Sequence, residues 1–307
     1  MTVLSKDEAI ARLHGGQALT RVDLSQIDLQ GVNLDRGRLS RAYLRSANLL
    51  GVSGQQIDLS HAVLGFARLA GANLVGANFS HAWLNNADLS DANCREANAS
   101  KAHFNSACLD RLQAPLANFS SADLRAARGD EANFSAANLE RARLGGTCLR
   151  RSNFSGANLY LAHLEAARLQ NTVWCKANLE RANFNRADLA GANLTGANLL
   201  AANLNAARLT SIVLQGADLL AATLQNAELE NADCTEASFF NANFQGATLS
   251  NVNFNGADLQ NANFENAVFD RVDFTNSWVR DASFTEARGL TAAQKHWLQA
   301  NGALNVP

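Results

Sequence analysis

The stretch ANLTGANLLAANLNA, residues 192–206, repeats one pattern every five residues: Ala, then Asn, then Leu, then two variable positions. The same frame runs from Leu24 to Phe284 without an insertion or deletion, and 45 of its 53 positions are Leu or Phe. Two residues earlier, 39 of 53 positions are Ala, and the position in between is Asn or Asp in 29 of 53 cases. The chain is therefore a repeat protein over almost its whole length.

A period of five residues fits neither regular secondary structure. Five residues advance an α-helix by about 140°, and an odd number conflicts with the two-residue alternation of a strand. A helix or strand would therefore scatter these leucines over several directions. The chain must turn a corner about once per quintet, with the Leu or Phe and the preceding small residue pointing inward. This predicts a coil with an axial core.

The quintets at 72–76, 192–196 and 262–266 closely resemble the pentapeptide-repeat family, whose pattern is A-(N/D)-(L/F)-x-x, and the resemblance covers about residues 18–288. It implies an all-β solenoid: a right-handed quadrilateral parallel β-helix with four quintets, or twenty residues, per coil. Outward positions that recur at twenty-residue spacing support that coil length independently; one such set is Ser40, Ser60, Ser80, Ser100 and Ser120.

A solenoid needs covered ends, because an open coil exposes its core and unpaired strand edges. Ser5 and Glu8 form a capping-box pattern that predicts a short helix to about His14, and Thr291 and Gln294 predict another, which carries Trp297 and Leu298. We therefore expect an N-terminal cap in 1–17, a rod-shaped β-helix of about thirteen coils in 18–288, and a C-terminal cap in 289–307.

The remaining composition gives no sign of a membrane, a cofactor or a metal. No stretch has signal-peptide or transmembrane character, so a bacterial, cytoplasmic protein is the expectation. The cysteines are odd in number, widely spaced and without a C-x-x-C pair, which favours thiols over disulfides or zinc ligands: Cys94, Cys108, Cys148, Cys175 and Cys234.

Nothing in the repeat predicts an enzyme. Asp58, Ser60 and His61 bring three catalytic residue types into one quintet, but their side chains should project from a convex wall, whereas a triad needs an oriented base in a pocket. Neither a phosphate loop nor an insertion that forms a cleft interrupts the pattern. We expect no catalytic residues and no cofactor.

The repeat is irregular between residues 94 and 129. Cys94, Ala99, Ala114 and Gly129 place small residues at the large inward position, and Leu112 is a large residue at the small inward position. We expect Leu112 to fill the space left by Ala114. Pro115 follows, and it predicts a local bulge or bend. A compensated packing change and a functional hinge are both compatible with this pattern.

Two sets of outward apolar residues are candidate interfaces. Leu200, Leu220 and Phe240 should lie on consecutive coils about 4.8 Å apart, with Trp278 two coils further on. This strip predicts a homodimer contact or a partner site. Near the N-terminus, Tyr43 and Trp83 occupy the position that is normally Asn or Asp, in one column with Val63 and His103. That column is either a partner site or a stacking ladder.

Charge is divided unevenly along the chain. Residues 1–208 carry 22 basic and 17 acidic side chains, whereas residues 209–307 carry 4 and 11. A basic column is interrupted at Ser121 and Leu161, so a solvated edge is favoured over an anion-binding or nucleic-acid track; it comprises Arg41, His61, His81, Lys101, Arg141 and Arg181. The acidic segment comprises Asp218, Glu228, Glu230, Asp233, Glu236, Asp258, Glu265 and Asp270. These residues are either ordinary charges spread over four faces or one acidic surface.

Two functions follow. The first is a non-enzymatic, rod-like protein–protein interaction module whose partner is another protein. The second comes from the resemblance: some bacterial pentapeptide-repeat proteins mimic DNA, bind DNA gyrase or topoisomerase IV, and protect it from quinolones or toxins. The acidic segment fits this alternative, whereas the net basic character of the first two-thirds opposes it.

Overall fold

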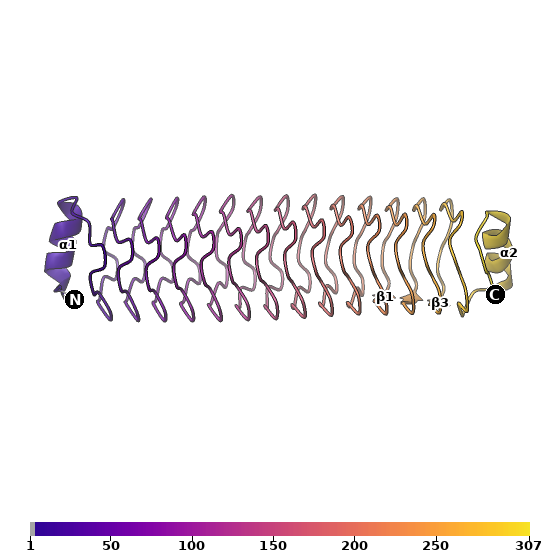
Figure 1. Ribbon diagram of the computed structural model, residues 1–307, viewed down its shortest axis with the longest axis horizontal. Helices are drawn as coiled ribbons and strands as arrows, with labels where there is room; N and C mark the ends of the chain where they lie inside the picture. The colour runs from indigo at the N-terminus through magenta and orange to yellow at the C-terminus, as the bar shows by residue number, and fades with distance from the viewer. Residues whose placement is uncertain (1–3) are drawn as a thin grey trace. The chain divides into compact units, whose positions relative to one another are not determined.

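The computed structural model describes residues 4–307, which form two compact units that meet in sequence between Asn158 and Leu159. Each unit is a stack of coils with twenty residues per turn (Figure 1). Successive coils pair in parallel in both units, for example between Asp58 and Asn78 and between Asn178 and Asn198. The predicted parallel β-helix with a twenty-residue coil is confirmed. One continuous domain over 18–288 stays a prediction.

The hydrogen bonds of one quintet explain its sequence. In residues 78–82, the Asn78 and Phe79 N–H groups donate to carbonyls one coil away, Ile57 at 2.8 Å and Asn98 at 2.6 Å. The His81 N–H donates to the Ser100 carbonyl at 3.0 Å, and the Ala82 N–H closes a turn on Phe79 at 2.8 Å. The Ser80 N–H then finds its acceptor in the Asn78 side chain, at 3.1 Å. Asn or Asp recurs at this position because its side chain satisfies the one backbone donor that the coil leaves over.

The second of the two variable positions has a positive φ in quintet after quintet, for example 57° at His81 and 56° at Arg141. This is the i+2 position of a type II turn, where the left-handed conformation costs a residue with a Cβ about 1–2 kcal/mol of conformational energy relative to glycine. Among the described residues with positive φ, none is Val, Ile or Thr. The turn thus excludes the β-branched residues that this conformation disfavours most.

Pro115 does not produce the bulge or bend that we expected, and that prediction was wrong. The coil continues through it: the Pro115 carbonyl accepts from the Glu96 N–H at 3.0 Å, and Ala117 closes its turn on Ala114 at 3.3 Å. Proline fits position i+1 of a type II turn, where its fixed φ is favourable. The N–H at this quintet position donates to a side chain in quintets such as those of Ser80 and Ser100, so proline removes no bond of the backbone ladder there.

In the irregular segment, three of the four small inward residues are followed by a phenylalanine; the fourth, Cys94, is followed by Ala99. Ala99, Ala114 and Gly129 each precede a Phe by one quintet, and these rings are buried and in contact. The centroids of Phe104 and Phe119 lie 5.6 Å apart, and those of Phe119 and Phe134 lie 5.5 Å apart. Leu112 is also buried, and that it fills the space left by Ala114 stays a prediction. The core volume that a small inward residue leaves empty is therefore filled largely by the phenylalanine of the following quintet.

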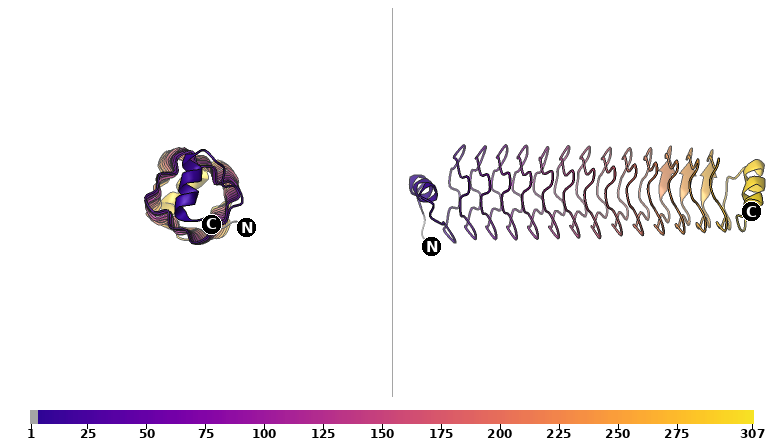
Figure 2. Two further views of the ribbon diagram at one scale, coloured as in Figure 1. Left: turned by 90° about the vertical axis from the view of Figure 1, so that its left-hand side faces the viewer. Right: turned by 90° about the horizontal axis from the view of Figure 1, so that it is seen from above.

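Both predicted capping helices are present. Helix α1 spans Lys6–His14, with the Ser5–Glu8 capping box formed, and it lies across the first coil (Figure 2). Helix α2 spans Ala292–Ala300, with the box between Thr291 and Gln294 formed, and it covers the last coil. The Gln294 side chain donates to the Val272 carbonyl at 2.7 Å, and Leu298 is fully buried. The caps thus remove the exposed core and edges at these two ends.

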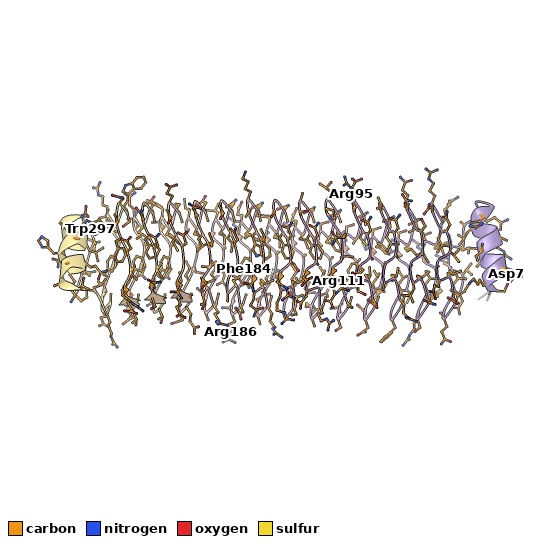
Figure 3. The ribbon with its side chains drawn as sticks, turned by 180° about the vertical axis from the view of Figure 1, so that it is seen from behind. Asp7, Arg95, Arg111, Phe184, Arg186 and Trp297 are labelled. Atoms are coloured by element: carbon orange, nitrogen blue, oxygen red, sulfur yellow. The ribbon has the colours of Figure 1, made fainter. Side chains whose placement is uncertain are left out.

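Three short strands are regular enough to form a sheet in the second unit. Strands β1 (Glu228–Glu230), β2 (Thr248–Ser250) and β3 (Val268–Asp270) pair in parallel, in the order β1-β2-β3. Only the middle residue of each strand points inward. Figure 3 shows the same division elsewhere, with Phe184 among the core side chains and Arg186 pointing outward.

Candidate interaction surfaces

Each coil presents four faces, which we number by the coil 42–61. Face 1 is 42–46, face 2 is 47–51, face 3 is 52–56 and face 4 is 57–61, together with the residues at multiples of twenty from them. Inward side chains are buried on every face, so only three positions of each quintet are available for recognition.

The predicted apolar strip lies on face 4 of the second unit. Leu200, Leu220 and Phe240 occupy consecutive coils, because the N–H groups that follow the first two donate to the carbonyls of the next coil at 2.8 and 2.9 Å. Leu220 is 37% exposed, whereas Leu200 and Phe240 are half-buried. Trp278, on the same face two coils beyond Phe240, is 61% exposed. Gln260 separates it from the strip, so the strip and Trp278 are two apolar areas on one face.

The aromatic column lies on face 1 of the first unit. Tyr43, Val63, Trp83 and His103 pair successively across four coils. The Trp83 and His103 rings stack with centroids 4.1 Å apart, and Trp83 is 49% exposed. None of the first three side chains carries the amide or carboxylate oxygen that accepts the leftover N–H in other quintets. The aromatic residues therefore give up a backbone contact that Asn would make.

A shallow hollow of about 370 Å³ adjoins this column. It is lined by Arg45 from one coil, by Val63, Gly65 and Phe66 from the next, and by Trp83, Asn85 and Asn86 from the coil after that. Phe66 is 52% exposed and has a φ of 61°. Sequence reasoning missed Phe66, although the sequence carries a signal: it is the only Phe, Tyr or Trp at the positive-φ position of the described coils.

In the first unit, the basic column forms an exposed edge of face 4. Arg41, His61, His81 and Lys101 all occupy the positive-φ turn position. The two imidazole rings stack at 4.7 Å, with an angle of 3° between them. Desolvation, together with repulsion from His61 and Lys101, lowers the pKa of His81. His81 is therefore harder to protonate than an isolated histidine.

Asp58, Ser60 and His61 do not form a triad. The Asp58 carboxylate accepts hydrogen bonds from the Ser60 backbone N–H at 3.0 Å and from the Asn78 side chain at 3.2 Å. The His61 ring stacks on His81 instead. Asp58 therefore has the same turn-stabilising role as the Asn in other quintets.

The acidic residues of the second unit surround the coils rather than forming one stripe. Glu265 lies on face 1; Glu228, Glu230 and Asp270 on face 2; Asp233 and Glu236 on face 3; Asp218 and Asp258 on face 4. Face 2 carries the densest group, on strands β1 and β3. The Asp270 carboxylate pairs with Arg271 at 3.0 Å, which lowers the pKa of Asp270.

In the first unit, face 2 carries carboxylate–guanidinium pairs between coils. Asp91 pairs with Arg111 at 2.6 Å, Glu131 with Arg151 at 2.9 Å, and Asp110 with Arg128. These ion pairs largely neutralise the charges of face 2 in the first unit and link its coils, so this face is not a strongly charged binding surface.

None of the helices within residues 4–307 has the length and apolar character needed to cross a membrane. Over the same residues, no group of three His, Cys, Asp or Glu side chains converges as metal ligands would. Cys94 and Cys234 are buried in the core, and burial raises the pKa of the Cys94 thiol to about 12 and that of Cys234 further still.

The family model for pentapeptide repeats matches the chain eight times, over residues 19–53, 55–91, 84–111, 117–156, 157–196, 182–219, 217–256 and 249–285. No curated protein sequence is significantly similar to the chain.

Among solved structures, HetL from the cyanobacterium Nostoc sp. strain PCC 7120, a pentapeptide repeat protein involved in heterocyst differentiation regulation, is 29% identical. The match covers 78% of this chain and 96% of HetL, with a TM-score of 0.47. A pentapeptide repeat protein from the Arabidopsis thaliana thylakoid lumen is 30% identical, covers 38% and 78% of the two chains, and has a TM-score of 0.22. A trypsin-treated form of QnrB1, a plasmid-mediated fluoroquinolone resistance protein, is 16% identical, covers 53% and 92%, and has a TM-score of 0.31.

Proposed function

This chain belongs to the pentapeptide-repeat family, and from that premise we propose that it is a non-enzymatic protein–protein interaction module. The observation that carries the proposal is the exposure of Trp83 and Trp278, at 49% and 61%, on faces whose other apolar side chains are mostly buried. Bulky aromatic residues are enriched at protein interfaces, and exposed apolar groups of this size favour a partner contact.

We assign self-association to the strip formed by Leu200, Leu220 and Phe240 on face 4. A two-fold axis through Leu220 would place the strip against its own copy, which is the isologous contact of most homodimers. The exposed area of three side chains is small for a stable interface, so the contact requires flanking residues of the same face. Flanking positions are small, as at Ala201 and Ala221, and leave the strip accessible.

Light scattering of the wild type and of Leu220→Glu tests this assignment. A carboxylate buried without a partner at the centre of the contact should convert a dimer to a monomer. Gln215→Glu is the matched control, because it adds the same charge at an exposed position of face 3. A wild type that is monomeric at high concentration refutes self-association, and face 4 is then left to a different protein.

DNA mimicry toward gyrase or topoisomerase IV is the second candidate, and the acidic excess of residues 209–307 favours it. The placement of the carboxylates guides the variant. Glu228 and Glu230 share face 2, whereas Glu236 lies on face 3. Under this candidate, the purified protein alters gyrase supercoiling, and reversing the charge of Glu228 and Glu230 weakens the effect more than Glu236→Lys. No effect at micromolar protein retires the candidate.

A further inference from the structure

The hollow on face 1 is shaped by a change in side-chain size along two neighbouring columns. On the coil before it stand Tyr43 and Arg45, and on the coil after it stand Trp83 and Asn85. Between them, Val63 and Gly65 are small. Because coils repeat at about 4.8 Å, the hollow is a slot about two coil spacings wide, enough for one extended peptide strand or one ring.

Trp83 is held in a fixed orientation beside this slot. One face of its indole stacks on His103, with centroids 4.1 Å apart, so the ring cannot fold toward the following coil. Its other side faces the short Val63. Phe66 adds a second exposed ring at the corner, in a left-handed conformation that disfavours residues with a side chain. The slot thus has two aromatic surfaces that the core does not use.

The electrostatics of the slot favour an anion. In the four quintets 42–46, 62–66, 82–86 and 102–106, Arg45 is the only Lys, Arg, Asp or Glu. Its guanidinium carbon lies 5.6 Å from the centroid of the Phe66 ring, which holds the charge at the slot. Within residues 4–307, no ion pair involves Arg45.

Backbone donors add to this preference. In other quintets, an Asn or Asp oxygen accepts the N–H of the residue two positions later, as Asp58 does for Ser60. Val63 and Trp83 have no such oxygen, so the N–H groups of Gly65 and Asn85 donate no bond of this kind. A cation and two backbone donors next to apolar rings match a carboxylate that is joined to a bulky apolar group.

We propose that this slot binds an extended segment of a partner protein in which an Asp or Glu adjoins an aromatic or large aliphatic residue. The apolar side chain packs over Val63 and Gly65 against Trp83 and Phe66, and the carboxylate pairs with Arg45. The proposal rests on the proposed interaction function and names the chemistry of one partner. It does not depend on the face 4 contact.

The test is a titration of the ¹⁵N-labelled protein with the acetylated hexapeptide Gly-Ser-Asp-Phe-Ser-Gly, followed at the tryptophan indole N–H signals. The Trp83 signal is identified by its loss in Trp83→Phe. We expect it to shift saturably, while the signals of the buried Trp174 and of Trp297 at the cap stay in place. Peptides with Asn for Asp, or Ala for Phe, should bind at least about tenfold more weakly.

Two variants test the assignment of the site. Gly65→Leu fills the slot without backbone strain, because Gly65 does not have a positive φ and a Cβ there would meet only the Asn85 carbonyl oxygen, at 3.6 Å. It should abolish the shift, and Arg45→Gln should weaken binding about tenfold. Gln55→Leu, which adds an exposed leucine on face 3, should bind as the wild type does.

Several outcomes overturn the proposal. These are the absence of a Trp83 shift at millimolar peptide, equal binding of the Asn peptide, or undiminished binding by Gly65→Leu. Any of them leaves the interaction function standing if the Leu220→Glu variant loses self-association. Conversely, a monomeric wild type that binds the hexapeptide at Trp83 supports this site while refuting the face 4 contact.

Discussion

Two glycines at inward positions should respond differently to the same added methyl group. A Cβ at Gly129 would lie 2.8 Å from Leu149 Cδ2 and 3.1 Å from Leu109 Cβ. At Gly54 the nearest atoms would be Leu74 Cδ2 at 3.1 Å and Ile57 Cγ2 at 3.4 Å. Leu109 Cβ is attached to a backbone that is hydrogen-bonded on both sides, so it cannot retreat, whereas the atoms near Gly54 are the ends of side chains. Gly129 is therefore overpacked by alanine, and Gly54 is not.

The expected sizes follow from this geometry. Gly129→Ala should lower the free energy of unfolding by about 1–3 kcal/mol, the usual cost of forcing extra volume into a filled core. Gly54→Ala should raise it by about 0.4–1 kcal/mol, because alanine restricts the unfolded chain and the site accepts it. Neither glycine has a positive φ, so backbone strain does not enter the comparison.

Urea unfolding followed by tryptophan fluorescence measures both changes, as shifts of the midpoint at constant slope. A double-mutant cycle isolates the contact: Leu149→Val removes the atom nearest to the new methyl group, so it should recover at least about 0.5 kcal/mol of the Gly129→Ala loss beyond additivity. If Gly129→Ala is as stable as Gly54→Ala, the segment around Gly129 contains a real void, and the account of phenylalanine filling the core is wrong.

Three further outcomes follow from single contacts. Asn98→Ala removes the acceptor for the backbone N–H two residues later, 3.1 Å away, and should cost about 1–3 kcal/mol of unfolding free energy in urea. Burial opposes the ionisation of Asp130, but hydrogen bonds, including those from Arg150, outweigh it and lower the pKa of Asp130. The ionised carboxylate therefore stabilises the folded state above the unfolded pKa of about 4, and this contribution is lost as the pH falls through the lowered folded pKa. Asp130→Asn should accordingly reduce the loss of stability at acid pH in a stability–pH profile. Cys94 and Cys234, with raised pKa values in the core, should react with Ellman's reagent at pH 8 only after unfolding. In the variant that keeps only these two cysteines, with Ser at 108, 148 and 175, rapid reaction of the native protein would contradict their burial.

Much of this fold is predictable from the sequence because its determinants are local. A quintet folds according to the hydrogen bonds of its own five residues and of the residues twenty positions away, so Ala, Asn and Leu at fixed offsets are sufficient to predict the coil. The capping boxes at Ser5 and Thr291 are local in the same sense, and both helices begin where those residues predict.

Packing inside the coil was not predictable in this way. Phe104 and Phe119 are in contact across two different faces of the coil. They are fifteen residues apart in the sequence, which is not the twenty-residue period of the coil. Columns of equivalent positions therefore do not reveal this contact. Pro115 misled the prediction for a different reason: proline usually interrupts a strand, but here it occupies a turn position whose N–H the coil does not need.

The departures from the repeat that carry functional information are those that cost the coil something. Trp83 replaces a residue that would accept a backbone hydrogen bond, and Phe66 places a large ring in a conformation suited to glycine or asparagine. Neither change fills the core, since both side chains are about half exposed. Gly129 also departs from the repeat, but the buried ring of Phe134 in the next quintet fills core volume that Gly129 leaves empty. Within the coil these two rings have only surface partners, His103 for Trp83 and Arg45 for Phe66, and a bound segment at the Trp83 slot would bury the faces that remain exposed.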